Sequence, residues 1–286
     1  MKHRLLLVVL TFCGFSQYTF AQDNAKPAEK YTAHNKGKFF ISWGGNRESY
    51  SKSDVRFWGK DYDFTIENME AHDKGKGYNI DYVNPGRMTI PQTNFRMGYF
   101  INDHYSIAIG WDHMKYVMTT NQIAAIYGTI NLPADDEASM YNGTYTHTPT
   151  VITKDMLQYE HTDGLNYINT EFSRHDDLSH LLRLPNIDKF QINLTEGVGA
   201  GILFPKTNTT LLGKERHDDF HVSGYGVSAK AGINFTFYKY FYIQGEIKGG
   251  YINMQDIRTT KSTDDHAAQQ FFFFQRIIAV GGIFKL

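Results

Sequence analysis

Eight segments of the chain alternate between apolar residues and polar or small ones with a period of two, which predicts β-strands with two unlike faces. In the sixth segment, Tyr225 and Val227 alternate with Gly226 and Ser228. The facing of the fourth segment stays open, because its alternation is the weakest. The predicted strands span residues 37–50, 92–100, 104–118, 164–174, 189–204, 221–237, 241–254 and 271–286.

The connections between these segments alternate in length. Short connections at 101–103 and 238–240, with an intermediate one at 175–188, separate four long ones. This alternation is typical of transmembrane β-barrels, which have short periplasmic turns, long external loops and both termini in the periplasm. The predicted fold is all-β: a closed antiparallel transmembrane barrel of about eight strands in the cell outer membrane. The long connections span residues 51–91, 119–163, 205–220 and 256–270.

The last segment, residues 271–286, is an amphipathic strand. One face carries large apolar residues together with Arg276, and the other mixes small, polar and apolar residues. Closing strands of this kind are typical of bacterial outer-membrane barrels. We expect this segment to pair with the first strand, because closure removes the sheet edges that lipid cannot satisfy.

A soluble lipocalin-like barrel would have the same strand number and the same period. It would place its large apolar face inside, whereas here the smaller face is rich in glycine, which fits the inside of a narrow barrel. Aromatic residues also gather around the predicted turn at 238–240, as in an interfacial girdle. We therefore favour the transmembrane barrel. The aromatic residues are Phe237, Tyr238, Tyr240, Phe241 and Tyr242.

The first 21 residues have the pattern of a secretory signal peptide. Lys2 and Arg4 precede a short apolar stretch that ends at Phe12. The stretch is far shorter than the roughly 20 residues of a spanning helix. Thr19 and Ala21 place small residues at positions −3 and −1, so we predict cleavage after Ala21.

Cys13 is the only cysteine, and it lies inside this predicted signal. A lipoprotein signal at Cys13 is the rival interpretation, although the bulky Phe12 precedes it where a small residue is expected. Cleavage would leave a mature chain without disulfides, thiolate metal sites or a cysteine nucleophile. Residues 22–35 would then be a flexible periplasmic segment, and residues 36–286 the barrel.

Composition limits the classes of partner that the protein is expected to bind. The formal net charge is −1, so nothing indicates a nucleic-acid partner. No later apolar run reaches the length of a spanning helix, so a membrane location requires a closed barrel. The expected partners are outer-membrane lipid and lipopolysaccharide, and the barrel-assembly machinery during insertion. No cofactor is expected.

Charged residues on the predicted inward faces suggest a polar lumen. They include Arg96, Lys230, Glu246 and Lys248, with Asp112 on the same face. Charges removed from water persist when they are paired and hydrogen-bonded, and Glu246 is the expected partner of the lysines. The simplest interpretation is a plug of salt bridges that rigidifies the barrel. The functional alternative is a narrow conductance or a buried site.

Titratable residues also gather where the third and fourth predicted strands reach the external rim. Asp112 and His113 lie near one end, and Glu160, His161 and Asp163 lie near the other. Two histidines and three carboxylates could perform acid–base chemistry or bind a divalent metal. The alternative is an ordinary hydrated rim. The candidate catalytic residues are Asp112, His113, His161 and Asp163; no metal is assigned, and no strong enzymatic motif occurs.

The first long connection contains Asp61 and Asp63 alternating with aromatic and β-branched residues. This favours a strand that extends the wall above the membrane, with a hairpin arm around Tyr62 to Ile66. Calcium binding by these aspartates and Glu67 is the alternative, but the spacing lacks a Gly-centred EF-hand loop.

Some stretches of the chain carry a resemblance to known proteins; they begin at Trp43, Ser53, Asp61, Ile90, Trp111, His161, Gly197 and Phe204. Together they resemble a family of outer-membrane β-barrel proteins without assigned activity that is common in Bacteroidetes. Proteobacterial relatives include barrels described as lipid A oxidases, so the resemblance implies a possible lipid A-modifying role. Those relatives often have His after Phe-Pro, where this chain has Lys206, and many barrels end in Phe, where it has Leu286.

Two functional hypotheses follow from the sequence. The first is a non-enzymatic outer-membrane barrel with a filled polar lumen, which has a structural role or offers its surface loops for interaction. The second is an outer-leaflet lipid A-modifying enzyme with its site at the rim. The enzymatic hypothesis requires the rim residues to lie close together, and the structural hypothesis does not.

Overall fold

The computed structural model describes residues 33–77, 81, 91–217 and 219–286. The predicted signal peptide, its cleavage site and most of the predicted periplasmic segment lie outside these residues. In the described part of the chain, no helix has the length and apolar character needed to cross a membrane.

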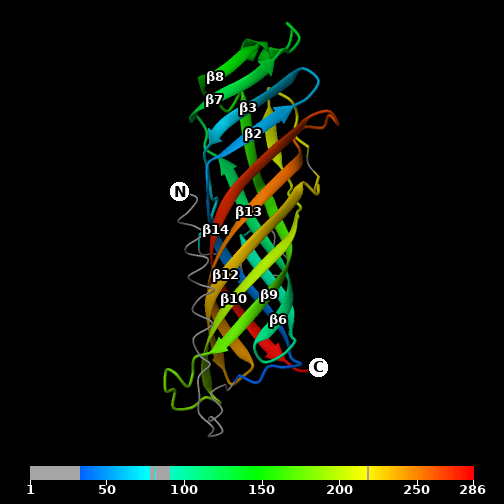
Figure 1. The fold of residues 1–286 in the computed structure, drawn as a ribbon. Coiled ribbons are helices and arrows are strands. Elements are labelled where there is room, and N and C mark those ends of the chain that lie inside the picture. The colour runs from blue at the N-terminus through cyan, green and yellow to red at the C-terminus, as the bar shows by residue number, and fades with distance from the viewer. Residues whose placement is uncertain (1–32, 78–80, 82–90, 218) are drawn as a thin grey trace, which may run out of the picture. The chain divides into compact units, whose positions relative to one another are not determined.

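Eight antiparallel strands close into a ring (Figure 1). Each strand pairs with the next in chain order, and the last pairs back with the first from Phe39↔Phe284 to Tyr50↔Phe273. The predicted fold class is therefore confirmed. The ring consists of β1 (Phe39–Tyr50), β5 (Thr93–Phe100), β6 (Tyr105–Met118), β9 (Leu157–Asp177), β10 (Phe190–Leu203), β12 (Gly224–Phe237), β13 (Phe241–Arg258) and β14 (His266–Phe284).

The predicted strand bounds agree with the structure best at the periplasmic ends. The largest differences lie at the outer ends, where β9 begins at Leu157 instead of residue 164 and β14 begins at His266 instead of residue 271. These extra residues continue the wall beyond the part of the barrel whose exterior is apolar.

Two of the long connections form a sheet that extends the wall at its outer end. Beyond β14, the sheet continues through four further strands in the order β2, β3, β7 and β8. The expected strand around Tyr62 to Ile66 is confirmed as part of β3. The additional strands are β2 (Ser53–Trp58), β3 (Tyr62–Met69), β4 (Ala71–His72), β7 (Ile123–Ile130), β8 (Gly143–Val151) and β11 (Asn208–Leu211), with the 3₁₀ helix η4 (Glu137–Tyr141) before β8.

An apolar core fills the outer end of the barrel and the inner face of this sheet. We call this region the head core. Phe57 and Phe64 stack at 5.6 Å between ring centroids, and Tyr159 meets Phe57 edge-on at 5.5 Å. The core therefore joins the added sheet to the ring. Its members include Val55, Phe57, Phe64, Ile66, Met69, Met114, Tyr116, Ile126, Leu157, Tyr159, Ile252, Met254, Phe271 and Phe273.

The exterior of the ring is apolar over a broad band. Soluble proteins rarely expose so many large apolar residues together, and lipid-facing barrel walls do. The lipocalin-like alternative is therefore wrong, because the large apolar face points outward. The exposed residues include Ile41, Met97, Ile107, Ile109, Phe172, Val198, Val227, Ile233, Ile243, Ile247, Phe274, Ile278 and Val280.

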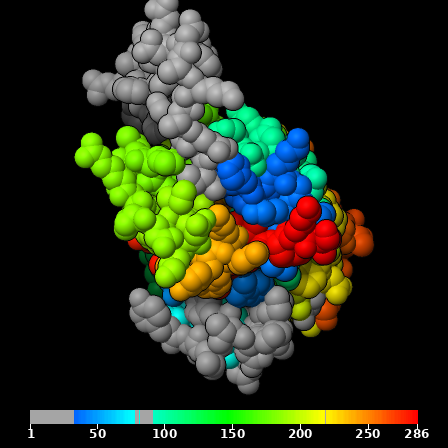
Figure 2. Space-filling view, turned by 90° about the horizontal axis from the view of Figure 1, so that it is seen from below, coloured from blue at the N-terminus to red at the C-terminus, as the bar shows by residue number. Residues whose placement is uncertain are grey.

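Figure 2 looks onto the end of the barrel where the C-terminal strand (red) and the 238–240 turn (orange) lie. Tyr238, Tyr240 and Phe241 of the predicted girdle are exposed near this end, whereas Tyr242 is buried inside the barrel and was wrongly assigned to the girdle. Tyr99, Tyr238, Tyr240, Phe241 and Phe284 are all more than a third exposed.

Removal of one aromatic side chain from the head core should loosen the added sheet while the eight-stranded ring in the membrane stays closed. Phe57 is fully buried, so Phe57→Ala should cost roughly 3–5 kcal/mol through a cavity. We expect faster proteolysis around residues 131–136 and an unchanged heat-induced gel shift of the barrel. Ile123→Ala is the control, because Ile123 is 74% exposed. Equal protease resistance in both variants would contradict the joining role of this core.

Candidate functional site

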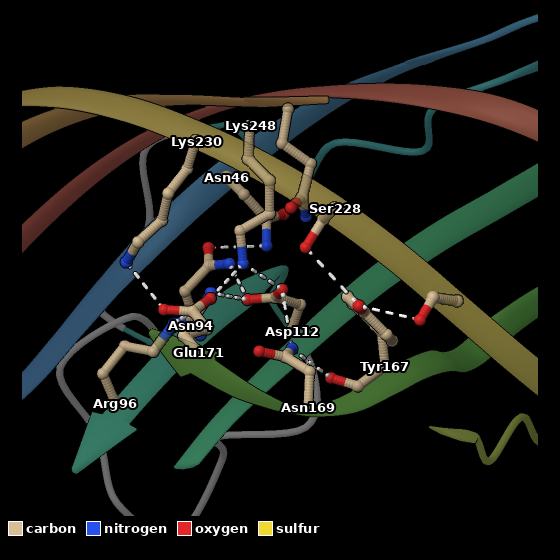
Figure 3. Close-up of polar contacts among 12 residues, drawn as sticks. Asn46, Asn94, Arg96, Asp112, Tyr167, Asn169, Glu171, Ser228, Lys230 and Lys248 are labelled. Atoms are coloured by element: carbon tan, nitrogen blue, oxygen red, sulfur yellow. Dashed lines mark hydrogen bonds and ion pairs between the residues drawn. The ribbon is translucent and has the colours of Figure 1, made fainter. Parts of the chain in front are cut away.

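Six charged side chains meet inside the ring at the level of its apolar exterior, and we call them the lumen network. Figure 3 shows the side chains of Arg96, Lys230 and Lys248 directed toward Glu171 and Asp112. The alternation of each strand places these residues on its inward face. Three cations face three carboxylates, so the network is balanced. It comprises Arg96 on β5, Asp112 on β6, Glu171 on β9, Lys230 on β12, and Glu246 and Lys248 on β13.

Glu171 is the centre of the lumen network. Its Oε1 lies 2.9 Å from Arg96 Nε and 2.6 Å from Lys248 Nζ, and its Oε2 lies 2.6 Å from Lys230 Nζ. Asp112 forms a second bridge, with 2.6 Å to Arg96 Nη2 and 2.8 Å to Lys248 Nζ. Charged residues on opposite walls are thereby joined through two carboxylates.

Amide side chains donate further hydrogen bonds to the carboxylates of the network. Asn94 Nδ2 donates to Asp112, Asn169 Nδ2 donates to the same carboxylate at 3.3 Å, and Gln244 Nε2 donates to Glu246 at 2.8 Å. Buried charges are tolerated when they are both paired and hydrogen-bonded in this way. The lumen network is therefore an internal brace and not a set of free charges.

Glycine makes room for these long side chains. A Cβ placed on Gly110 would lie 2.9 Å from Arg96 Nε, and one on Gly197 would lie 3.1 Å from Lys230 Cε. The first distance is shorter than real Cβ contacts, and the second is shorter than most of them. The glycine-rich inner face expected from the sequence is thus occupied by the network.

The sequence prediction missed the central residue. It placed Arg96, Lys230, Glu246 and Lys248 inward, where the structure also has them, but it named Glu246 as the partner of both lysines. Glu246 reaches only Lys230, at 3.3 Å, whereas Glu171 reaches both. Glu171 belongs to the strand whose facing stayed open. The signal that could have found it is the order Asn169, Glu171, Ser173 against Ile168, Thr170, Phe172.

Side chains narrow the lumen on both sides of the network. Toward the periplasm they leave a polar cavity of about 50 Å³, lined in part by Ser42, Asn193 and Thr195. Below it, Phe100, Tyr242 and Ile283 form a small buried apolar cluster. Toward the outside, Glu48, Gln92 and Gln275 form a further hydrogen-bonded layer beneath the head core. Within the described residues, side chains occupy the lumen along its length apart from this cavity.

The rim residues do not converge as predicted. Asp112 points inward and belongs to the lumen network, while the adjacent His113 points to the other face and lies 2.8 Å from Asn166 through its Nδ1. Consecutive residues of a strand face opposite sides, which separates these two. A bulge between Met114 and Tyr116 also places His161 opposite Tyr116, beyond His113.

The other rim residues have separate surroundings. Asp163 is exposed, and Glu160 lies 3.4 Å from Lys74. The calcium alternative is not supported, because two of its proposed ligands have other partners: Asp63 is paired with Arg56, and Glu67 with His147. In the described part of the chain, no group of three or more His, Asp or Glu side chains could hold a metal ion.

His161 belongs instead to a buried polar chain in the head core. Its Nδ1 lies 3.0 Å from Thr207 Oγ1, and its Nε2 lies 3.2 Å from Tyr159 OH. Tyr159 donates to Gln269 Oε1 at 3.1 Å, and Gln269 donates to Tyr116 and Ser53. Burial lowers the pKa of His161 to about 3, so the imidazole is neutral and poorly suited to proton relay near pH 7.

No protein-family model matches this chain, and no curated protein matches it. Solved structures similar to it include the outer membrane protein OprG from Pseudomonas aeruginosa, at 9% identity and a TM-score of 0.37, covering 90% of this chain and 100% of that one. The N-terminal β-barrel domain of OprF from the same organism has 8% identity, a TM-score of 0.30 and coverage of 87% and 98%. The outer membrane protease OmpT from Escherichia coli has 9% identity, a TM-score of 0.24 and coverage of 90% and 100%.

The chain is an integral outer-membrane β-barrel. This assignment rests on its own closed antiparallel ring and its lipid-facing exterior, since closed barrels with an apolar outer band are the β-structures that span membranes. Its role is a separate question, which the lumen and the head address.

Removal of the central carboxylate should destabilise the barrel more than removal of Glu246. Glu171→Gln leaves three buried cations facing two carboxylates, at a cost on the order of 3–5 kcal/mol. Glu246→Gln should cost less, because it breaks one ion pair at 3.3 Å. Urea unfolding in lipid vesicles and the temperature of the heat-induced gel shift measure both. Glu196→Gln, on the outer face of β10, is the control. Equal losses for Glu171 and Glu246 would refute the central position of Glu171.

The outer end should weaken on mild acidification. The folded head excludes the proton that His161 binds when exposed, because its pKa of about 3 lies below the usual value near 6.5. The unfolding free energy of the head is therefore unaffected by His161 protonation above pH 6.5. Between pH 6.5 and pH 3 it falls by up to about 1.4 kcal/mol per pH unit. Proteolysis of the head at pH 7 and pH 5 measures this slope. His161→Gln should reduce it, and His72→Gln, at an exposed site, should not. An unchanged pH dependence of head stability in His161→Gln would show that His161 does not cause it.

Proposed function

We propose that this protein is a closed outer-membrane barrel that holds an ordered sheet beyond the outer leaflet, as a structural element or an interaction platform. The observation that carries the proposal is the filled lumen. An eight-stranded barrel has an interior just wide enough for side chains. Here the head core, the lumen network and the apolar cluster around Phe100 fill it in succession.

The ordered head supports the platform role. A flexible loop loses conformational entropy when it binds a partner, whereas a packed sheet has lost it already. On the head surface, Tyr127 stacks with His147 at 5.0 Å and Trp58 stacks with His266 at 5.5 Å. Arg56 lies over the Trp58 ring and pairs with Asp63. The surface therefore presents fixed aromatic and charged groups.

The edge strand of the head also has features that limit unwanted pairing. In β8, Pro149 removes one backbone donor, and the register shifts opposite Ile126 and Tyr127. Proline and bulges at sheet edges reduce edge-to-edge association. Recognition through side chains of the sheet face is therefore favoured over addition of a strand to its edge.

The enzymatic alternative, a lipid A-modifying activity, comes from the resemblance to barrels described as lipid A oxidases. It requires several reactive groups at one place near the outer leaflet. Asp112 is held in the lumen network, His161 in the head core, and Asp163 is exposed elsewhere. Because these groups are separated, the closed structural barrel is the better-supported function.

Conductance across planar bilayers tests the proposal. The reconstituted wild-type protein should show no stable channel steps, because side chains block the lumen. A large general-diffusion porin in the same bilayer is the positive control. Insertion is verified by the heat-induced gel shift of the recovered protein. Reproducible steps from inserted wild-type protein would show that the lumen conducts and would overturn the proposal of a lumen blocked by side chains.

A further inference from the structure

Leucines are exposed at the periplasmic end of the barrel, in the connection between β9 and β10. Four of the seven residues 178–184 are leucines, and we call this segment the leucine turn. Leu181 is 79% exposed and Leu182 is 50% exposed. With Leu178 they are spaced i, i+3 and i+4, which places them on one side of a helical turn. Burial of this side against an apolar surface would be favourable.

The leucine turn has an ordered backbone. The Leu182 amide donates to the Leu178 carbonyl at 2.9 Å, which closes one helical turn. Arg183 then adopts the left-handed conformation, with φ at 53°, and the Leu184 amide donates to the Ser179 carbonyl at 3.0 Å. A left-handed residue followed by such a bond is the Schellman motif, which ends helical turns. The leucine side chains are therefore held out by a defined local structure.

Hydrogen bonds fix the level of the leucine turn beside the periplasmic part of the lipid-facing wall. The Leu178 amide donates to the Ile192 carbonyl at 2.8 Å, and the Ile192 amide donates to Ser179 Oγ at 3.1 Å. Ile192 alternates with the inward Asn193 and pairs with Phe235, which is 37% exposed. The leucine turn is therefore continuous with the apolar exterior of the barrel.

The connection that contains the leucine turn lies at the side of the barrel end (light green in Figures 1 and 2), next to the turn between β12 and β13 (orange). The Tyr238 amide donates to the Lys189 carbonyl at 2.9 Å, and Lys239 Nζ lies 2.5 Å from Asp188 Oδ1. Tyr238 and Tyr240 are 65% and 68% exposed. Exposed tyrosines of this kind mark the level of a membrane interface, so the leucine turn lies next to that interface.

Unpaired cations accompany the exposed leucines. Residues 178–189 and 238–240 together carry Arg183, Lys189 and Lys239 against one carboxylate, Asp188. Arg183 and Lys189 are exposed, and within the described residues neither forms an ion pair. Basic side chains next to apolar ones are typical of segments that lie in the headgroup region of anionic lipid. Because the leucine turn adjoins a wall that already contacts lipid, this surface fits the bilayer itself.

We propose that the leucine turn is a lipid anchor in the headgroup region of the periplasmic leaflet. Leu181 and Leu182 contact acyl chains there, and Arg183 and Lys189 contact the phosphates of anionic headgroups. The anchor attaches one side of the barrel to the periplasmic leaflet. It is separate from the platform role, which concerns the opposite end of the molecule.

Fluorescence quenching by lipid tests the anchor in the full mature protein. The chain after the predicted cleavage site has no cysteine, so single cysteines can carry an environment-sensitive fluorophore. Leu181→Cys is compared with Ile278→Cys, on the lipid-facing wall, and with Asp135→Cys, exposed in the external connection between β7 and β8. Each labelled protein is reconstituted in vesicles of phosphatidylcholine and phosphatidylglycerol whose acyl chains carry bromine, which quenches fluorophores that contact lipid.

The label at position 181 should be quenched roughly half as strongly as the label at 278, because the leucine turn lies in the interface and not in the acyl core. The label at 135 should not be quenched. Quenching at 181 no stronger than at 135 would overturn the anchor. A label at 181 that is shielded from water but not quenched by bromine would also overturn it, since a protein would then cover the turn. Absence of quenching at 278 would instead count against the membrane location.

Charge variants test the contribution of the two cations. In the Leu181→Cys protein, Arg183→Gln combined with Lys189→Gln should lower the quenching in phosphatidylglycerol vesicles to the level seen in phosphatidylcholine alone. Glutamine has a Cβ as arginine does, so the left-handed backbone at position 183 meets the same steric demand. Lys154→Gln, exposed in the external connection between β8 and β9, is the control. Quenching that is equal in both vesicles, or unchanged in the double variant, would overturn the role of the cations.

Discussion

Charge balance inside a narrow barrel is the constraint on which this structure depends. The lumen has no room for bulk water, so each charged side chain must find its counter-charge on another wall. Glu171 meets this requirement by contacting Arg96, Lys230 and Lys248 from three other strands. The same contacts join opposite walls of the ring. One set of ion pairs therefore both neutralises the lumen and connects strands across it.

The exterior and the head follow from the same separation of environments. Because the polar residues of each strand are used inside, their alternate residues are free to form the apolar wall that contacts lipid. Above the lipid the sheet exterior contacts water, so the apolar residues point to the interior. The head core buries Phe57, Phe64 and Tyr159 between the ring and the added sheet. The barrel thus changes along its axis from a polar interior in the membrane to an apolar interior outside it.

The strand number, their order and the lipid-facing side could be predicted from the sequence, because all three depend on period-two alternation and connection length. The β8 strand could not, since its Thr-rich sequence buries almost nothing and leaves no alternation to detect. Glu171 was not predicted to face the lumen, because apolar and polar residues alternate clearly only in the second half of its strand. The rim cluster was predicted from strand pairing alone. The bulge near Tyr116, which separates His113 from His161, depends on register that one sequence does not specify.

A double-mutant cycle between Glu171 and Lys248 tests the role of charge balance most directly. The unfolding free energies of Glu171→Gln, Lys248→Met and the double variant are compared in the same vesicles. Each single variant leaves an unpaired buried charge, whereas the double variant returns the lumen to neutrality. The double variant should therefore be more stable than Glu171→Gln alone. A double variant destabilised by the sum of the two single losses would show that the residues act independently, and that neutrality of the lumen does not hold the barrel together.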